Sequence, residues 1–390
     1  MSVFLSKEEL ELKEEIKQFA EEYVAPKVNQ IEKSKSYDVI RRIIRELGKR
    51  GFLRVLHPKE YGGSEFGVIG DTIIAEELSA VNFALDLSRL ASIHLCGMPL
   101  NRFGTHEQKE KFLVPLIKGE KIGAIGITEP DVGSDAAGMK TRARREGDYY
   151  IINGEKRFIT NGSQADYICL FAITTPLPIT RPKTGMTAFI LEKGMKGFTV
   201  EKDYELMGLN GTKISHLRFE NVAIPVENRI ADENYGFKVL MDELNSERIA
   251  IAGQGVGVAK AAFETALRYS TERVQFDREI RGFEGVSFVI AEMATRIEAA
   301  RALTIQAART IDRVSNIRAT KIASMAKYYA CHSANWIAKE GIQLMGGIGY
   351  TKEHPMERYA RDAPLLEIGG GTRNVMLYLI QREAYRERGF

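Results

Sequence analysis

The chain has 390 residues, with 55 basic and 52 acidic side chains and a formal net charge of +3. Its length exceeds the roughly 250–300 residues at which a single hydrophobic core stops growing, so we expect two or three domains. The nearly balanced charge gives no support for nucleic acid or an anionic membrane surface as a partner.

The cysteines and the N-terminus bear on the cellular compartment. Cys96, Cys169 and Cys331 lie far apart in apolar surroundings, and there is no Cys-x-x-Cys pair. This pattern favours reduced, buried thiols over a disulfide framework or a zinc site. The opening SVFLSKEELELKEEI is acidic where a signal peptide is basic, and no apolar run approaches 18 residues. We therefore expect a cytoplasmic protein without a membrane span.

Residues 1–121 predict an α-helical domain. Ser6–Glu9 and Thr105–Gln108 have the capping-box pattern that starts helices. His94 falls in an apolar helix, and we interpret it as a hydrogen-bonded core histidine. Asp86 and Arg89 are three residues apart in LDLSRLA. We favour an ion pair on a helix surface, although their apolar neighbours leave a pocket-lining role open.

Residues 122–234 predict a β domain. Between Gly123 and Gly162, short β-branched and apolar runs alternate with Pro-Asp-x-Gly, Glu-Gly-Asp and Asn-Gly turn signals. No βαβ spacing is present, so we expect an antiparallel barrel or sandwich. The proline-rich segment from Thr174 to Gly185 predicts a loop. The loops carry hydroxyl side chains close to glycines, at Thr128, Ser134 and Thr160. Such loops suit a planar polar ligand, because glycine lets the backbone approach closely and hydroxyls can donate and accept hydrogen bonds.

Residues 235–390 predict four long helices with short connections, which is typical of a four-helix bundle. IAIAGQGVGVAK, residues 249–260, resembles a dinucleotide-binding turn. Its glycines miss the Gly-x-Gly-x-x-Gly spacing and its flanks are helical, so we interpret the segment as a close helix contact. The chain contains no HExxH, GxxxxGK[ST] or GxSxG pattern, and we predict no metal site.

Glu247 stands out in this helical part. Leu240, Leu244, Glu247 and Ile251 follow at i, i+4, i+7 and i+11, which is one face of a helix. An acid on an apolar stripe is unusual because burying a charge is costly. It forms either an interior ion pair, for example with Arg248, or a general base whose pKa is raised by desolvation. The pattern alone does not choose between the two.

Several of these stretches together resemble the acyl-CoA dehydrogenase family. The matching motifs are Thr128-Glu-Pro-x-x-Gly-Ser-Asp135, Asn153-Gly-x-Lys156, Phe158-Ile-Thr-Asn-Gly162, Gln343-x-x-Gly-Gly-x-Gly349 and Arg361-Asp-Ala363. They occur in the family's order over essentially the whole chain. The resemblance implies a helical N-terminal domain, a middle β domain and a C-terminal four-helix bundle in a homotetramer. It also implies FAD as cofactor and an acyl-CoA thioester as substrate.

The resemblance also implies residue roles. The isoalloxazine is expected against Ile125, Ile127, Thr128, Gly133, Ser134, Phe158, Ile159 and Thr160, with Thr372 also in contact with the flavin. Arg273, Phe276, Gln343, Gly346 and Gly347 match FAD-binding positions, the last three in or beside a motif that reaches a neighbouring subunit's FAD. The substrate is expected near Ser134, Leu244, Arg248, Gly369, Gly370 and Gly371.

The catalytic base departs from the commonest family pattern. Many members carry a glutamate in the turn before the last helix, where this chain has Gly370. A minority, including isovaleryl-CoA and long-chain dehydrogenases, place the base on the long helix immediately before an arginine, as in Glu247-Arg248 here. The resemblance thus implies that Glu247 takes the α-proton while the β-hydrogen passes as hydride to flavin N5, giving a 2-enoyl-CoA. Electrons would leave through an electron-transferring flavoprotein.

Other functions stay open at this point. Arg89 could read a second carboxylate on a dicarboxylic acyl group, or Asp86 could act as base toward an alicyclic one. Gly370 could instead mark a flavin or acyl-CoA-binding protein without turnover. An oxidase or monooxygenase could also occupy the same fold.

Overall fold

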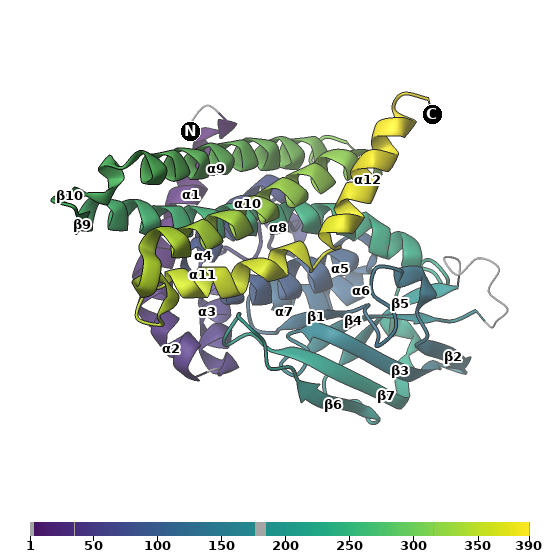
Figure 1. Cartoon of the computed structure of the whole chain (residues 1–390). Coiled ribbons are helices and arrows are strands. Elements are labelled where there is room, and N and C mark those ends of the chain that lie inside the picture. Colours follow the sequence, from purple (N-terminus) through teal and green to yellow (C-terminus); the bar gives the residue numbers. More distant parts are fainter. Residues whose placement is uncertain (1–3, 35, 176–184, 315, 390) are drawn as a thin grey trace.

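The computed structural model describes residues 4–34, 36–175, 185–314 and 316–389. Helices open and close the chain, and a β-sheet stands between them in the sequence (Figure 1). In the view of Figure 1 the sheet occupies the lower right, and the C-terminal helices cross the top. This order of helical, sheet and helical parts confirms the expected fold class.

The N-terminal helices begin where the sequence predicts. Ser6 and Thr105 both form complete capping boxes, with Glu9 and Gln108 as the reciprocal partners. The long helix α4 is followed by a π-helical turn at Ala91–Cys96. The helices of this part are α1 (Lys7–Phe19), α2 (Val28–Ser34), α3 (Tyr37–Lys49), α4 (Gly67–Leu90), α5 (Gly97–Phe103), α6 (His106–Gln108) and α7 (Val114–Ile117).

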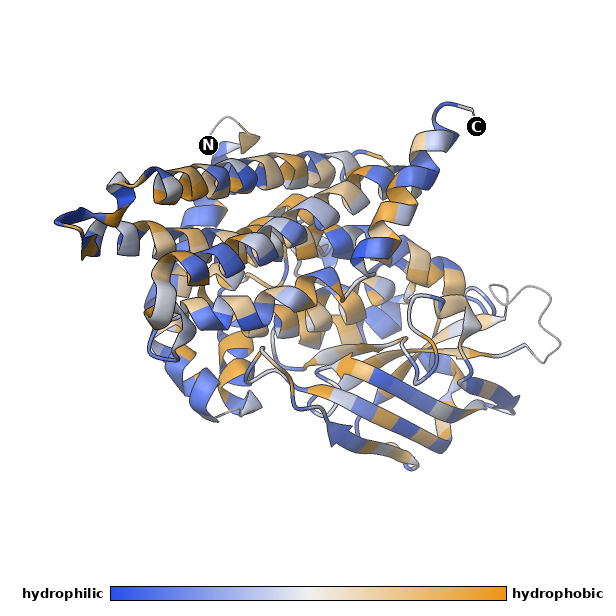
Figure 2. Cartoon of the chain, viewed as in Figure 1, coloured by the Kyte–Doolittle hydropathy of each residue, from blue (hydrophilic) through white to orange (hydrophobic). Residues whose placement is uncertain are grey.

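The middle of the chain forms an open, mixed sheet. The strand order is β6-β7-β3-β2-β4-β5-β8, and β1 pairs with β4. Strands alternate apolar and polar bands across this sheet (Figure 2). The strands are β1 (Gly123–Gly126), β2 (Arg142–Glu146), β3 (Tyr149–Thr160), β4 (Tyr167–Ile173), β5 (Met186–Glu192), β6 (Phe198–Asp203), β7 (Ile214–Pro225) and β8 (Arg229–Ile230).

Two details differ from the predicted antiparallel barrel or sandwich. The strand path does not close within the described residues, since β6 and β8 end it. The pairs β1–β4 and β2–β4 are parallel. The sequence pattern could not show this, because β1 reaches β4 across an excursion through two other strands. The predicted loop at Thr174–Gly185 lies mostly outside the described residues.

The C-terminal part confirms the bundle. Four long helices, α8 (Gly236–Glu272), α9 (Glu284–Ile311), α10 (Thr320–Met345) and α12 (Arg373–Arg386), pack around α10. The short helix α11 (Met356–Asp362) and the hairpin of β9 (Val274–Gln275) and β10 (Arg278–Glu279) complete it. Helix α8 also packs along α4, so it joins the bundle to the N-terminal helices.

Glycines make the α4–α8 contact possible, as the helix-packing interpretation predicts. A Cβ atom on Gly253 would lie 2.8 Å from the Thr72 carbonyl oxygen, and one on Gly257 would overlap the Glu76 carbonyl oxygen. The backbones of the two helices therefore touch at these positions, and the segment is helix throughout.

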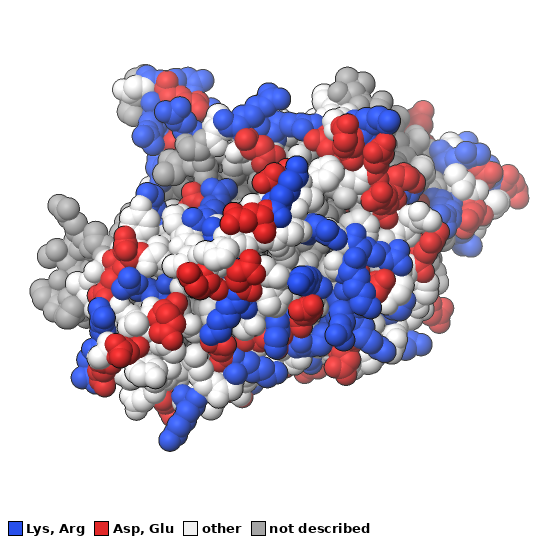
Figure 3. Space-filling model, turned by 180° about the vertical axis from the view of Figure 1, so that it is seen from behind, with Lys and Arg blue, Asp and Glu red and all other residues white. Residues whose placement is uncertain are grey.

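The described residues also bear on membrane insertion, metal binding and disulfide formation. In the described part of the chain no helix is both long and apolar enough to cross a bilayer, and no group of three acidic, histidine or cysteine side chains could hold a metal ion. All three cysteines are buried and free. Basic and acidic side chains are interspersed over the face in Figure 3.

The close contact of α4 and α8 gives a stability prediction. Gly257→Ala should lower the free energy of unfolding by about 1–3 kcal/mol, because the added methyl group forces the two backbones apart. Gly285→Ala is the matched control, since a Cβ there would meet nothing within 4 Å; it should be neutral or stabilising by up to about 1 kcal/mol. Urea unfolding measures both, and equal effects would contradict the packing account.

Candidate active site

Glu247 lies on α8 with only 6% of its surface exposed. Burial raises the pKa of its carboxyl group, because water no longer stabilises the charged form. Three nearby positive or protonatable groups, on Arg248, His94 and Lys327, act in the opposite direction and lower that pKa. Glu247 is thus a desolvated carboxyl group whose raised pKa is limited by basic neighbours.

The glycine turn before α12 packs against this carboxylate. A Cβ atom on Gly370 would lie 3.1 Å from Glu247 Oε1, and Gly370 has the left-handed φ of +64° that favours glycine. Arg248 Nε donates to the Gly370 carbonyl at 3.3 Å. Lys327 Nζ donates to the carbonyls of Gly371 at 2.7 Å and Leu366 at 3.2 Å. Cations from α8 and α10 therefore hold the turn beside Glu247.

His94 connects three elements beneath this site. Its Nδ1 lies 2.8 Å from an Asp71 oxygen on α4, and its Nε2 lies 3.0 Å from the Ser246 hydroxyl on α8. The ring is fully buried. The predicted hydrogen-bonded core histidine is confirmed, and it also lies close enough to Glu247 to act on the pKa of that carboxyl group, which the sequence did not indicate.

Asp86 and Arg89 pair with each other, but in the interior rather than on a surface. Both are fully buried. Arg89 donates to Asp86 and to Asp71, and Gln254 Nε2 donates to Asp86 at 2.8 Å. One nitrogen of Arg89, Nη2, has no partner among the described residues. The protein itself supplies most of the pairing, so the geometry favours a structural role over contact with an acyl group.

Two flavin-signature segments, the one after β1 and the one that ends β3, lie side by side, since the Arg157 N–H donates to the Thr128 carbonyl at 2.7 Å. Phe158 has a left-handed φ of +56° and leaves 56% of its surface exposed, with its ring 4.8 Å from that of Tyr204. The hydroxyls of Thr128, Ser134 and Thr160 have no hydrogen-bond partner within the described ranges. An exposed aromatic ring, with the free hydroxyls of Thr128 and Thr160 on the adjoining segments, fits a planar, polar group such as an isoalloxazine.

A buried ion pair supports this edge of the sheet. Both of its residues lie in the sequence motifs, but the motifs did not indicate that they pair. Lys156 Nζ lies 2.8 Å from a Glu129 oxygen and donates to the Ile127 carbonyl at 3.0 Å. Glu129 also accepts from the backbone N–H groups of Lys140 and Thr141. These bonds fix the loop that follows β1, because a buried charge must be paired.

The remaining predicted FAD residues lie elsewhere in the chain. Phe276 is 88% exposed between β9 and β10, at the end of the bundle opposite the sheet (Figure 1). Arg273, Gln343, Gly346 and Gly347 are exposed as well. Thr372 caps α12, its hydroxyl accepting from the Val375 N–H at 3.3 Å. Phe276, and Arg273 immediately before β9, therefore do not lie at the sheet in the same chain.

Sequence reasoning missed two further charged groups near Glu247. Lys327 is buried on α10, and burial lowers its pKa. Glu243, one helical turn before Glu247, is 2% exposed, and neither of its carboxyl oxygens has a partner among the described residues. The i, i+4 spacing was the available signal for Glu243; Lys327 had none, since it meets the site only in three dimensions.

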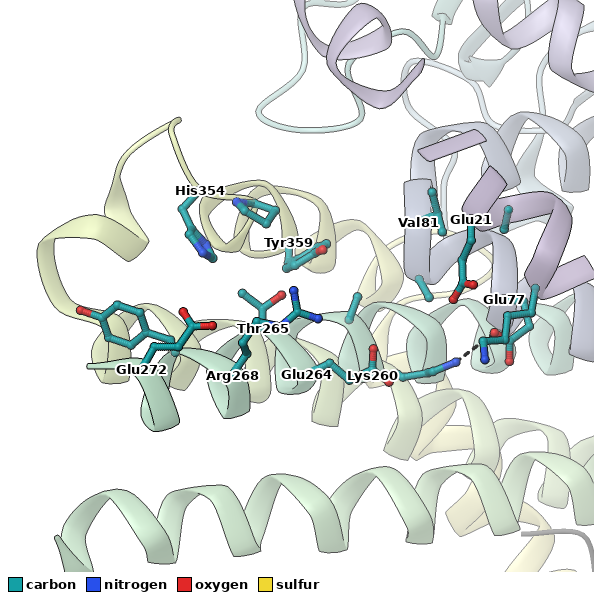
Figure 4. A pocket seen from close by; sticks show the side chains of 16 residues that line it. Glu21, Glu77, Val81, Lys260, Glu264, Thr265, Arg268, Glu272, His354 and Tyr359 are labelled. Carbon is teal, nitrogen blue, oxygen red and sulfur yellow. Dashed lines mark hydrogen bonds and ion pairs between the residues drawn. The ribbon is translucent and has the colours of Figure 1, made fainter. Parts of the chain in front are cut away.

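A separate pocket of about 380 Å³ lies between α4, α8 and α11 (Figure 4). Acidic and basic side chains both line it, including Lys260, which is paired with Glu77 at 2.9 Å. None of the predicted site residues is among its lining residues. We therefore place the candidate active site at Glu247 and Phe158.

Comparison with family models covers nearly the whole chain. Residues 6–120 match the N-terminal domain of acyl-CoA dehydrogenase, residues 124–222 the middle domain and residues 234–385 the C-terminal domain.

Relatives that align over most of their length agree with the match to the family models. The chain is 39% identical to a short-chain specific acyl-CoA dehydrogenase of Clostridium acetobutylicum, over 99% of this chain and 100% of that protein. It is 38% identical to the mitochondrial isovaleryl-CoA dehydrogenase of Pongo abelii, over 97% and 89%. It superposes with a TM-score of 0.94 and 39% identity on a chain from a solved structure described as an electron transferring flavoprotein of Acidaminococcus fermentans, covering 99% and 100%. The chain belongs to the acyl-CoA dehydrogenase family.

Proposed function

We propose that this protein is an FAD-dependent acyl-CoA dehydrogenase that converts an acyl-CoA to a 2-enoyl-CoA, with Glu247 as the base. The observation that carries the proposal is the buried Glu247 carboxylate packed against the Gly370 turn. The two positions from which this family supplies its base meet at one place, and here only α8 provides an acid.

The environment of Glu247 suits proton abstraction next to a thioester carbonyl. Such a proton is weakly acidic, so the base must be positioned and its proton affinity must be high. Burial raises the pKa of Glu247, and the basic groups of Arg248, His94 and Lys327 limit that rise. Glu247 acts in its deprotonated form, so activity should rise as the pH passes upward through that raised pKa.

The flavin has residues suited to it at the sheet edge. FAD, when bound, accepts the β-hydrogen as hydride. We propose that Phe158 offers its exposed face to the isoalloxazine and that Thr128, Ser134 and Thr160 hydrogen-bond it. Ile125, Ile127, Gly133 and Ile159 line the same edge. Leu244, Arg248 and Gly369–Gly371 would contact the substrate beside Glu247.

The exposed FAD residues support a shared site. Arg273, Phe276, Gln343, Gly346 and Gly347 lie on the surface, so we propose that they bind the FAD of a neighbouring subunit in a homotetramer. The likeness to a chain in an electron transferring flavoprotein structure supports such a flavoprotein as electron acceptor. We further propose domains at 1–121, 122–234 and 235–390. Three buried free thiols support a reducing, cytoplasmic location.

Replacing the base tests the proposal. Glu247→Gln should retain FAD but slow anaerobic bleaching of the flavin by acyl-CoA by about 10²–10⁴-fold, the usual contribution of a general base. The wild-type bleaching rate should fall as the pH drops, because Glu247 becomes protonated. The bleaching rate of the variant should not show this dependence on pH. Stopped-flow absorbance at several pH values measures both.

The same assay separates the other functions. A panel of alkyl, dicarboxylic and alicyclic acyl-CoAs is added without oxygen, followed by air and by an artificial acceptor. Unchanged bleaching in Glu247→Gln would contradict the assignment of the base. No bleaching of the wild type by any thioester would indicate a binding protein, and fast reoxidation by air would indicate an oxidase.

Moving the acid to the turn provides a geometric test. Glu247→Gly should be inactive, and adding Gly370→Glu should restore part of the bleaching rate, because a side chain at 370 starts beside the same place. Recovery should stay below wild type, since the φ of +64° is strained for glutamate and the Ile251 methyl must move. Gly369→Glu in the same background is the control, because a Cβ there meets only the Leu365 carbonyl oxygen, at 3.8 Å. Equal recovery from both positions would contradict the geometry.

A further inference from the structure

Glu243 is a buried acid to which the proposed reaction assigns no task. It is 2% exposed, and both carboxyl oxygens lack a hydrogen-bond partner among the described residues. A buried polar group without a partner destabilises the fold by about 1–3 kcal/mol or more. Buried carboxyl groups in proteins are therefore normally paired, and one that is not points to a partner that arrives with a ligand.

The surroundings of Glu243 favour its neutral form. Burial raises the pKa of its carboxyl group well above the usual range, and the charge of Glu247 raises it further. Arg248 and Arg102 act to lower that pKa, but Arg248 hydrogen-bonds Asn245 and Gly370, and Arg102 pairs with Asp242. Cys96 and Cys169 face Glu243 from the N-terminal helices and β4, and burial keeps both thiols protonated.

A neutral carboxyl group has one donor and one carbonyl acceptor to offer. A secondary amide has the complementary pair, an N–H donor and a C=O acceptor. The pantetheine arm of every acyl-CoA carries such amides, so a polar partner for Glu243 does not require an unusual acyl group.

The position of Glu243 selects this arm over the acyl chain. From Glu247, α8 runs in its C-terminal direction into the sealed Gln254–Asp86–Arg89 network. In its N-terminal direction it passes Glu243 and the partly exposed Asp242–Arg102 pair. The amide nitrogen nearest the sulfur lies five bonds, about 6 Å, from the acyl α-carbon, and side chains four residues apart on a helix have Cβ atoms about 5–6 Å apart.

We propose that Glu243 is a ligand-binding residue whose carboxyl group hydrogen-bonds an amide of the pantetheine arm, one helical turn from the place where Glu247 takes the α-proton. This inference rests on the proposed acyl-CoA site. Glu243 and Glu247 then have separate roles on one helix face. Glu243 binds the pantetheine arm of the thioester, and Glu247 removes the α-proton.

Calorimetric binding of acetyl-CoA to the FAD-loaded protein tests the proposal without turnover, because acetyl-CoA has no β-carbon to oxidise. Glu243→Leu should weaken binding by about 10-fold or more, since the amide loses its partner. Glu243→Gln should stay within about 3-fold, because its amide can still donate and accept. Asp242→Asn is the matched control on the neighbouring, more exposed position and should change nothing.

Two kinetic comparisons identify the ligand group. With butyryl-CoA, Glu243→Leu should raise KM more than it lowers kcat; with S-ethyl thiobutyrate, which lacks the arm, wild type and variant should be alike. An equal loss with both thioesters would overturn the proposal in favour of a structural role, and so would unchanged acetyl-CoA binding. A loss confined to 4-hydroxybutyryl-CoA would overturn the arm assignment in favour of the acyl chain.

Further controls keep the result interpretable. Glu243→Met serves as a second apolar variant if Glu243→Leu does not fold. Wild-type protein that binds no acyl-CoA at all would contradict the proposed function itself. Wild-type protein that binds acetyl-CoA as tightly as Glu243→Leu contradicts only the role of Glu243.

Discussion

Removal of the Glu247 carboxylate from water is the constraint on which the rest of the site depends. A carboxylate in an apolar helix face is costly to bury, and the same burial makes it a stronger base. The fold meets this constraint by bringing basic side chains from several elements toward the carboxylate. Arg248 comes from the same helix, His94 from the π-helical turn after α4 and Lys327 from α10.

Two of these side chains also shape the turn at Gly370. Arg248 and Lys327 bind its backbone carbonyls, so two groups that act on the pKa of Glu247 also fix the backbone opposite it. Glycine at 370 is what allows the turn to approach, since any Cβ there would press on Ile251. The absence of a glutamate in the turn and its presence on α8 are therefore two aspects of one packing arrangement.

Local patterns predicted much of the molecule. Capping boxes at Ser6 and Thr105 placed helix starts, because their hydrogen bonds join residues three apart. The glycines of α8 indicated close helix contact, and helical spacing placed Glu247 on an apolar face. Features that depend on distant segments could not be predicted in this way.

Three differences between the predictions and the structure show why distant contacts could not be predicted. Asp86 and Arg89 were expected on a surface, but Asp71, fifteen residues before Asp86, and Gln254 enclose them. The sheet was expected to be an antiparallel barrel or sandwich, but β1 pairs in parallel with β4 and the described strands leave two edges. Lys327 reaches the site across the bundle, and no local spacing encodes that approach.

The central claim is that Glu247 on α8 is the base that removes the α-proton. Hydrogen exchange at the substrate tests this claim most directly. Wild-type protein and Glu247→Gln, both loaded with FAD, are incubated without oxygen in heavy water with butyryl-CoA, and deuterium at the acyl α-carbon is measured by mass spectrometry. The account predicts exchange catalysed by the wild type and none above background in the variant. Equal exchange by both proteins would contradict it.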